Sequence, residues 1–85
     1  MLRLSDSARS THTADGAVVL DVKYGRMFRF NPTGSRIWQL LRSGVEEKNI
    51  PGLLVREFSA DPTTAAADTE AFIASLRRHE LIELR

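Results

Sequence analysis

The sequence predicts an α+β domain: a three-stranded antiparallel meander followed by three helices, in a winged-helix-like arrangement. Period-two alternation and turn residues dominate up to residue 30, and helical apolar spacing dominates from residue 32 onward. Two pairs, Asn31-Pro32 and Asp61-Pro62, are typical helix starts. The chain has 85 residues, which is room for one modest core. We therefore expect a single domain over residues 1–85, with its core in about 9–84.

The first two strands are expected on either side of a tight turn. Arg9–Thr13 is short and polar, and Asp15-Gly16 after it is a strong hairpin signal. The second strand then runs from Gly16 to Val22 and is the best strand pattern in the chain. By the two-residue period, one face of this strand carries three aliphatic side chains, those of Val18, Leu20 and Val22.

The third strand is predicted over Arg26–Phe30, after a tight connection at Tyr24-Gly25. Its residues alternate, so we expect the two phenylalanines, Phe28 and Phe30, to point inward. Met27 and Arg29 then point outward. Because the strand order is 1-2-3, this strand is an edge of the sheet.

The junction between sheet and helices is predicted in detail. Asn31 is a good N-cap, and Pro32 suits the first helical position because it loses no needed donor there. Gly34 puts no side chain on the first turn, which allows the helix to pack close to the sheet. Trp38 is the single tryptophan, and we expect it to be buried.

Three helices follow from the apolar spacing and the cap residues. The first is expected over Pro32–Arg42, the second from near Asn49 to Phe58, and the third from Pro62 to about Glu80. The core stripe expected on the third helix consists of Ala65, Thr69, Phe72, Ile73 and Leu76.

The two ends of the chain are expected to differ. Leu2 and Leu4 lie in a mixed segment and should be loosely attached at best. Leu81, Ile82 and Leu84 form an apolar tail that should fold back on the core.

Composition excludes several functions. Twelve basic and eleven acidic residues give a net charge of +1, which is no electrostatic footprint for nucleic acid or an acidic membrane. The chain has no cysteine, so disulfides, thiol nucleophiles and cysteine zinc sites are excluded. No signal peptide and no membrane-spanning apolar run is visible, and a cytoplasmic protein is the expectation.

No active site is predicted, and the chain is expected not to be an enzyme. The two histidines, His12 and His79, lie at opposite ends of the sequence, and no serine stands in a nucleophile motif. No glycine-rich phosphate loop or metal-ligand spacing is present either. We accordingly expect no cofactor and no metal.

The third predicted strand is the best candidate for a binding surface. Its Met-Phe-Arg-Phe run is unusually apolar for an exposed edge, which either aggregates or has a partner. An extended peptide can add to such an edge as a further strand. The backbone of Arg26–Phe30 would then bind the peptide, and Met27 and Arg29 would present side chains toward it.

The exposed flank of the third helix could form the other wall of the groove. Ala71, Ser75 and the edge of Phe72 would make a shallow floor, while Asp68 and Arg78 would select charges at its ends. A plainer alternative stays open, in which Ala71 and Ser75 are merely good helix formers at the boundary of the core.

DNA binding by a winged helix is the other alternative. A recognition helix reads bases with residues near its N-terminus. Here that end is Thr63-Thr64-Ala65-Ala66-Ala67-Asp68, which has no basic or amide side chain. The arginines are scattered and are typical of a solvated face.

Taken together, these residues resemble the PqqD-like family, the peptide-recognition elements of ribosomally made, modified peptides. The resemblance spans about residues 9–84. It is carried by the string Asp15-Gly16-Ala17-Val18-Val19-Leu20-Asp21, Gly25, Phe30-Asn31-Pro32-Thr33-Gly34, Ile37-Trp38, Leu41 and Gly44, and then by Ile50, Leu54, Phe58, Asp68, Phe72, Leu76 and Leu81-Ile82. The family pattern usually has a glycine before the last Leu-Ile pair, where this chain has Glu80.

Within that family, the chain is most similar to the stand-alone recognition proteins of lasso peptide biosynthesis. The resemblance implies that the chain binds the leader segment of a precursor peptide on Arg26–Phe30 and the third helix. It also implies delivery of the precursor to a separate cysteine protease and to an ATP-dependent macrolactam synthetase. A PqqD-like chaperone of another modified-peptide pathway is the alternative.

Overall fold

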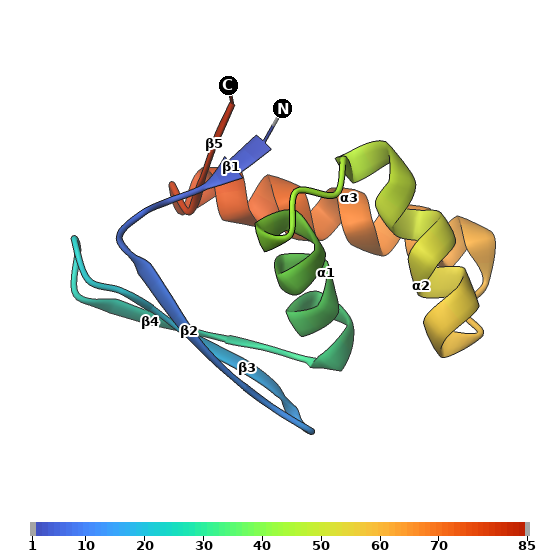
Figure 1. The fold of residues 1–85 in the computed structure, drawn as a ribbon, viewed down its shortest axis with the longest axis horizontal. Coiled ribbons are helices and arrows are strands. Elements are labelled where there is room, and N and C mark those ends of the chain that lie inside the picture. Colours follow the sequence, from blue (N-terminus) through green and yellow to red (C-terminus); the bar gives the residue numbers. More distant parts are fainter. Residues whose placement is uncertain (1, 85) are drawn as a thin grey trace.

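The computed structural model describes residues 2–84 and contains a three-stranded antiparallel sheet followed by three α-helices (Figure 1). This confirms the predicted α+β class. In chain order the elements are β1 Leu2–Leu4, β2 Ala8–Thr13, β3 Gly16–Asp21, β4 Arg26–Phe30, α1 Pro32–Arg42, the 3₁₀ turn η1 Glu47–Asn49, α2 Ile50–Phe58, α3 Pro62–Arg78 and β5 Ile82–Leu84.

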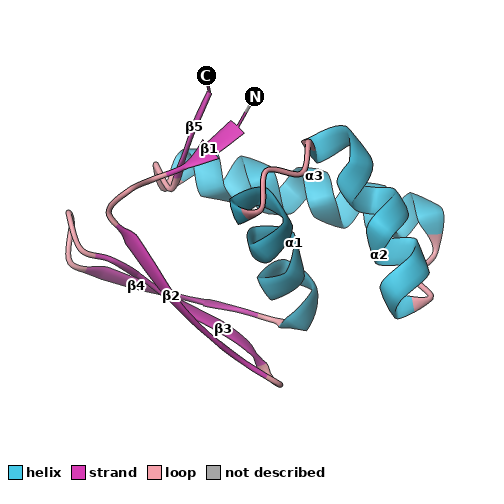
Figure 2. Ribbon diagram, in the orientation of Figure 1, coloured by secondary structure: helices cyan, strands magenta, loops and turns pink. Residues whose placement is uncertain are grey.

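The main sheet has the order β2-β3-β4, and neighbouring strands are antiparallel. Its strands are drawn in magenta in Figure 2. Its register places Ala17 opposite Phe30 and Asp21 opposite Arg26. The hairpin between β2 and β3 turns at Ala14 and Asp15, and β3 begins at Gly16, where a side chain would collide with the carbonyl of Phe30. Within residues 2–84, β4 pairs only with β3, so its outer edge is open.

The helices lie on one side of this sheet (Figure 1). The β3 residues on that side are the alternating set that does not contain Val18 and Leu20. Ala17, Val19 and Asp21 are buried, whereas Val18 and Leu20 are exposed. The predicted alternation is therefore present, but the bulkier aliphatic face meets solvent. The register explains this, because Ala17 and Val19 stand opposite the inward-pointing phenylalanines of β4.

The core forms between the sheet and the helices. It is centred on large side chains of the three helices, with Val19 from the sheet and the segment after α3 completing it. The side chains that are fully buried and largest are Trp38, Ile37, Ile50, Leu54, Leu76, Leu81 and Val19.

Both helices that begin at a predicted cap have that cap. The side chain of Asn31 accepts a hydrogen bond from the amide of Gly34 at 2.8 Å, and Asp61 accepts one from Thr64 at 3.1 Å. Each bond satisfies an amide that the first helical turn leaves unpaired. These two local signals fixed the starts of α1 and α3.

The two ends of the described chain pair with each other, which the sequence did not predict. β1 and β5 form an antiparallel ribbon, with Leu4 opposite Ile82. Leu4 packs against the core, so the expected loose attachment of this segment is wrong. Leu81 and Ile82 are buried as expected. The predicted packing of the Leu84 side chain lies outside what the structure describes.

The third helix ends at Arg78, slightly before the predicted end near Glu80. The amide of Leu81 bonds the carbonyl of Leu76, and the amide of Glu80 bonds that of Arg77. This is a Schellman ending, and it requires a left-handed residue after the cap. Glu80 supplies it with φ 58°, which explains why a glycine is usual at this place in the family pattern.

Candidate functional site

A cleft of about 260 Å³ lies between β4 and α3, and we call it the β4–α3 cleft. Its lining combines the last residues of β4, one face of the C-terminal half of α3 and the segment after that helix. The lining residues are Phe28, Arg29, Phe30, Asn31, Phe72, Ser75, Leu76, His79 and Leu81.

Phenylalanines form the β4 wall of the cleft. Phe28 and Phe30 point to the helix side of the sheet, as predicted, and both are partly buried. Phe30 meets the ring of Phe72 edge-on at 4.8 Å and that of Trp38 at 5.7 Å. Phe28 lies 4.8 Å from the ring of His79. These contacts hold the rings in place and give the cleft an apolar surface.

The α3 wall combines apolar and polar side chains on one helix face. Phe72, Ser75, Leu76 and His79 are spaced three and four residues apart, so they follow one stripe of the helix. Phe72 also rests against α1 at Gly34, where an added Cβ would lie only 2.9 Å from Cε1 of the ring. The glycine thus makes room for a side chain of the cleft.

The predicted site residues divide into those that line this cleft and those that do not. Five of the ten line it, namely Phe28, Arg29, Phe30, Phe72 and Ser75. Met27 is 62% exposed and points to the opposite face of the sheet. Asp68, Ala71 and Arg78 are exposed on α3 and do not line the cleft.

Four residues that line the cleft were not predicted as site residues, namely Asn31, Leu76, His79 and Leu81. The α3 residues predicted at the site are Asp68, Ala71, Phe72, Ser75 and Arg78, and of these Phe72 and Ser75 line the cleft. Helical spacing from Phe72 and Ser75 reaches His79, and this is the signal that could have found His79. Leu76, which was assigned to the core stripe, is buried there and also borders the cleft.

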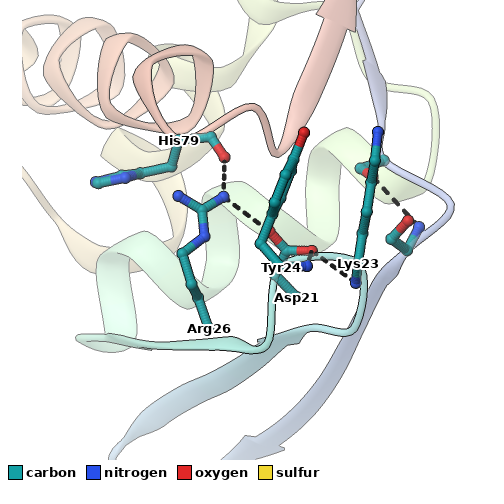
Figure 3. A network of polar contacts seen from close by, with 7 residues as sticks. Asp21, Lys23, Tyr24, Arg26 and His79 are labelled. Carbon is teal, nitrogen blue, oxygen red and sulfur yellow. Dashed lines mark hydrogen bonds and ion pairs between the residues drawn. The ribbon is translucent and has the colours of Figure 1, made fainter.

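Arg26, the remaining predicted site residue, is engaged inside the protein (Figure 3). Its Nη2 donates to Oδ2 of Asp21 at 2.8 Å and to the carbonyl oxygen of His79 at 2.7 Å. The guanidinium also lies 5.0 Å from the ring centre of Tyr24 and 5.3 Å from that of Phe28. Its side chain is therefore committed to contacts between β4, the preceding turn and the end of α3.

Asp21 is the anionic centre of this network. Its side chain is 4% exposed. The hydrogen bond from Arg26 lowers the pKa of the Asp21 carboxyl below its ordinary value, although burial acts in the opposite direction. The backbone amides of Lys23 and Tyr24 add further hydrogen bonds at 3.1 and 3.4 Å. Asp21 thus stays ionised and orients both the turn and Arg26.

A second polar group surrounds His12 on the helix side of β2. The Nδ1 atom lies 2.9 Å from Oγ of Ser35 and 3.0 Å from Nε2 of Gln39, and Nε2 lies 3.2 Å from Oγ of Ser10. These bonds join β2 to α1. Over the described residues no group of three or more His, Asp or Glu side chains could hold a metal ion. Between Leu2 and Leu84 no helix has the length and apolar character needed to cross a membrane.

Comparison with known families identifies the class of protein. Residues 16–82 match the family of coenzyme PQQ synthesis protein D (PqqD), which is most of the chain. The chain belongs to the PqqD family, as the sequence resemblance implied. No curated protein matches it in sequence.

Two solved structures are similar over almost the whole chain. One is "TbiB1 in Complex with the TbiA(beta) Leader Peptide", with a TM-score of 0.87 and 34% identity over 98% of this chain and 96% of that one. The other is "Lasso peptide synthetase B1 complexed with the leader peptide", with a TM-score of 0.84 and 26% identity over 98% of each chain. Both of those proteins hold a leader peptide.

Proposed function

We propose that this protein is a non-catalytic adaptor that binds the leader segment of a precursor peptide in lasso peptide biosynthesis. The observation that carries the proposal is the open apolar edge of β4 beside the β4–α3 cleft. An unpaired edge strand of this kind is a template for another strand. The similarity to two leader-bound structures supports the choice of a leader peptide as that strand.

Binding proceeds by β-strand addition in this proposal. The backbone groups along the open edge of Arg26–Phe30 pair with an antiparallel leader strand, and this pairing provides affinity for any extended peptide. Side chains on alternate leader residues point toward α3, because successive side chains of a strand point to opposite faces. They enter the cleft against Phe28, Phe30 and Phe72, which favour apolar groups.

Charges around the cleft set specificity. Arg29 borders the cleft at the edge strand, and Asp68 and Arg78 lie exposed on α3. We assign to them the selection of leader charges at the two ends of the bound segment. Met27 and Ala71 lie outside the cleft lining, and their proposed role is limited to contacts with the parts of the leader that extend beyond it.

The adaptor delivers the bound precursor to a separate cysteine protease and to an ATP-dependent macrolactam synthetase, and it works in the cytoplasm. The lasso pathway is preferred over another modified-peptide pathway because one of the similar structures is itself a lasso peptide synthetase B1. We expect the gene of this protein to lie in a cluster that also encodes a short precursor, a protease and a synthetase.

The test uses a fluorescein-labelled peptide with the leader sequence of the precursor from the same gene cluster, called the cognate leader below. Fluorescence anisotropy should show saturable binding that a scrambled peptide does not compete. Ser75→Trp places a large ring in the cleft and should weaken binding by about tenfold or more, by analogy with the loss of a buried interface anchor.

Ala67→Trp is the matched control, because it puts the same ring on an exposed part of α3 outside the cleft lining. It should leave affinity unchanged. Arg29→Ala and Arg78→Ala should each weaken binding without unfolding the domain. Unchanged affinity in both arginine variants would refute their role in selecting leader charges. Unchanged affinity in Ser75→Trp would refute the cleft as the binding site of the leader.

Duplex DNA is the competing ligand suggested by the winged-helix-like order of elements. DNA binding predicts a duplex affinity that falls steeply with salt. The first turns of α3 carry Thr63, Thr64, Ala67 and Asp68 on their exposed side, which gives a recognition helix no cation or amide to read bases with. We expect no retardation of duplex DNA in a gel at low salt.

A further inference from the structure

The two walls of the β4–α3 cleft are joined by a charged link at one end. Arg26 is the first residue of β4, and its guanidinium reaches the carbonyl oxygen of His79, the residue that caps α3 (Figure 3). The same nitrogen, Nη2, donates to the carboxylate of Asp21 on β3. We call the three-residue unit of Asp21, Arg26 and the His79 carbonyl the clamp.

Each group of the clamp is held by several neighbours, although the Arg26 side chain is 38% exposed. Asp21 is buried and held by two amides of the turn that follows β3. The His79 carbonyl lies at the C-terminal end of α3, where the helix dipole favours a cation. The rings of Tyr24 and Phe28 flank the guanidinium at 5.0 and 5.3 Å. Charge-assisted hydrogen bonds in such a setting are stronger than neutral ones.

The clamp lies directly beside the peptide-binding surface. Phe28 is two residues beyond Arg26 on the same face of β4, and its ring contacts that of His79 at 4.8 Å. Both Phe28 and His79 line the cleft. Toward the other end of the cleft, the walls meet through the rings of Phe30 and Phe72. Ring packing therefore joins the walls at both ends, and the clamp adds a charged link at the end near Phe28 and His79.

We propose that Asp21 and Arg26 are positioning residues that set the separation of β4 and α3, so that a leader strand paired to β4 can reach α3 with its side chains. The inference rests on the proposed function for its ligand, but the position of the two walls is a property of the free protein. A peptide that must contact both walls binds tightly only when they are already in place.

The first experiment measures the walls without any peptide. The chain has no cysteine, so spin labels at Met27→Cys on β4 and Ala74→Cys on α3 report their distance cleanly. Both positions are exposed and lie outside the cleft lining. In the background of Asp21→Asn or Arg26→Met, we expect the distance distribution from electron double resonance to shift or broaden.

Glu57→Gln is the matched control. Arg36 on α1 and Glu57 on α2 form an ion pair at 2.8 Å, the same length as the pair in the clamp, but at an exposed place outside the cleft lining. Its loss should leave the distance distribution as in the unsubstituted protein. A loss of stability alone would not change the distance distribution, because the label pair reports on the folded molecules.

The second experiment measures affinity for the labelled cognate leader at a temperature where circular dichroism shows each variant to be folded. Asp21→Asn and Arg26→Met should each weaken binding by about tenfold, because part of the binding free energy is then spent on bringing the two walls into place. Glu57→Gln should bind like the unsubstituted protein. Asp21→Asn keeps a side-chain oxygen for the turn amides, so it remains informative if Arg26→Met does not fold.

The outcomes separate the two claims. Failure of the unsubstituted protein to bind the cognate leader overturns the proposed function, and the label distances still test the clamp. Unchanged distance distributions in the clamp variants overturn the positioning role. So does leader affinity in the folded variants within about threefold of the unsubstituted protein, a difference comparable to ordinary surface substitutions.

Discussion

Gly34 in α1 lies against the ring of Phe72 in α3 so closely that a Cβ at Gly34 would come within 2.9 Å of the Cε1 atom of that ring. The distance is shorter than ordinary carbon contacts, so any side chain at this position must displace the ring. Phe72 lines the β4–α3 cleft, and a glycine in the first turn of α1 therefore decides the shape of a cleft on another helix.

Gly34→Ala is expected to destabilise the protein and to alter the cleft. Overpacking of this kind costs about 1–3 kcal/mol, and a displaced Phe72 ring should also weaken leader binding. Urea unfolding and anisotropy with the cognate leader measure the two effects. Gly52→Ala is the control, because no atom lies within 4 Å of the added Cβ. In a helix it should stabilise by about 0.5–1 kcal/mol, and equal effects in the two variants would contradict the packing argument.

Trp38→Ala should destabilise strongly because Trp38 is 1% exposed and lies at the centre of the core. We expect a loss of about 3–5 kcal/mol, the range for truncating a buried aromatic ring. Met27→Ala is the comparison, since Met27 is 62% exposed, and it should change stability by no more than about 0.5 kcal/mol. Urea denaturation at pH 7 measures both, and a loss below about 1 kcal/mol in Trp38→Ala would refute the central placement of Trp38.

Asp21 should make stability depend on pH in the acid range. The bond from Arg26 lowers the pKa of Asp21 in the folded protein, so the unfolded chain takes up a proton at a higher pH than the folded one. Its contribution is complete above the unfolded pKa of about 3.9 and disappears as pH falls through the lower folded pKa.

The measurement compares the free energy of unfolding of the unsubstituted protein and Asp21→Asn between pH 7 and pH 2.5. The stability advantage of the unsubstituted protein should be constant near neutrality and should shrink below about pH 4. An advantage that stays the same down to the lowest pH would mean that ionised Asp21 does not stabilise the fold.

Glu80→Gly should stabilise the protein because Glu80 has φ 58° after the end of α3. A left-handed conformation costs an L-residue about 1–2 kcal/mol, and glycine removes this cost. Part of the gain in stability is offset because glycine also gives the unfolded chain more conformational freedom. We expect a net gain of about 0.5–1 kcal/mol in thermal or urea unfolding. Glu80→Ala keeps the Cβ and removes the charge, so it should give no such gain. A similar gain from both changes would point to the charge instead.

Most elements of the fold could be predicted because their causes are local. Alternation along Arg26–Phe30 placed Phe28 and Phe30 on the inner face, and Asn31 and Asp61 marked the starts of α1 and α3 through hydrogen bonds that span three residues. The β1–β5 ribbon was missed because its two strands lie at opposite ends of the chain and are only three residues long.

The site was predicted only in part, for a related reason. The edge strand followed from the order of the strands, but the face of α3 that meets it depends on how the helix is rotated in the fold. Alternation showed that Val18 and Leu20 share a face, and it could not show which face the helices cover. The helices cover the face that carries Ala17 and Val19, which are opposite the two phenylalanines of β4.

The sequence by itself determined where the three strands of the meander and the three helices begin, which residues alternate, and that the third strand of the meander is an apolar edge. These properties follow from hydrogen bonding and side-chain periodicity within a few residues of one another. The tertiary structure decided the stripe of α3 that lines the cleft, the burial of Asp21 and the link from Arg26 to His79. Those residues are 53 positions apart in the chain, and their contact exists only because packing brings the end of α3 to the start of β4.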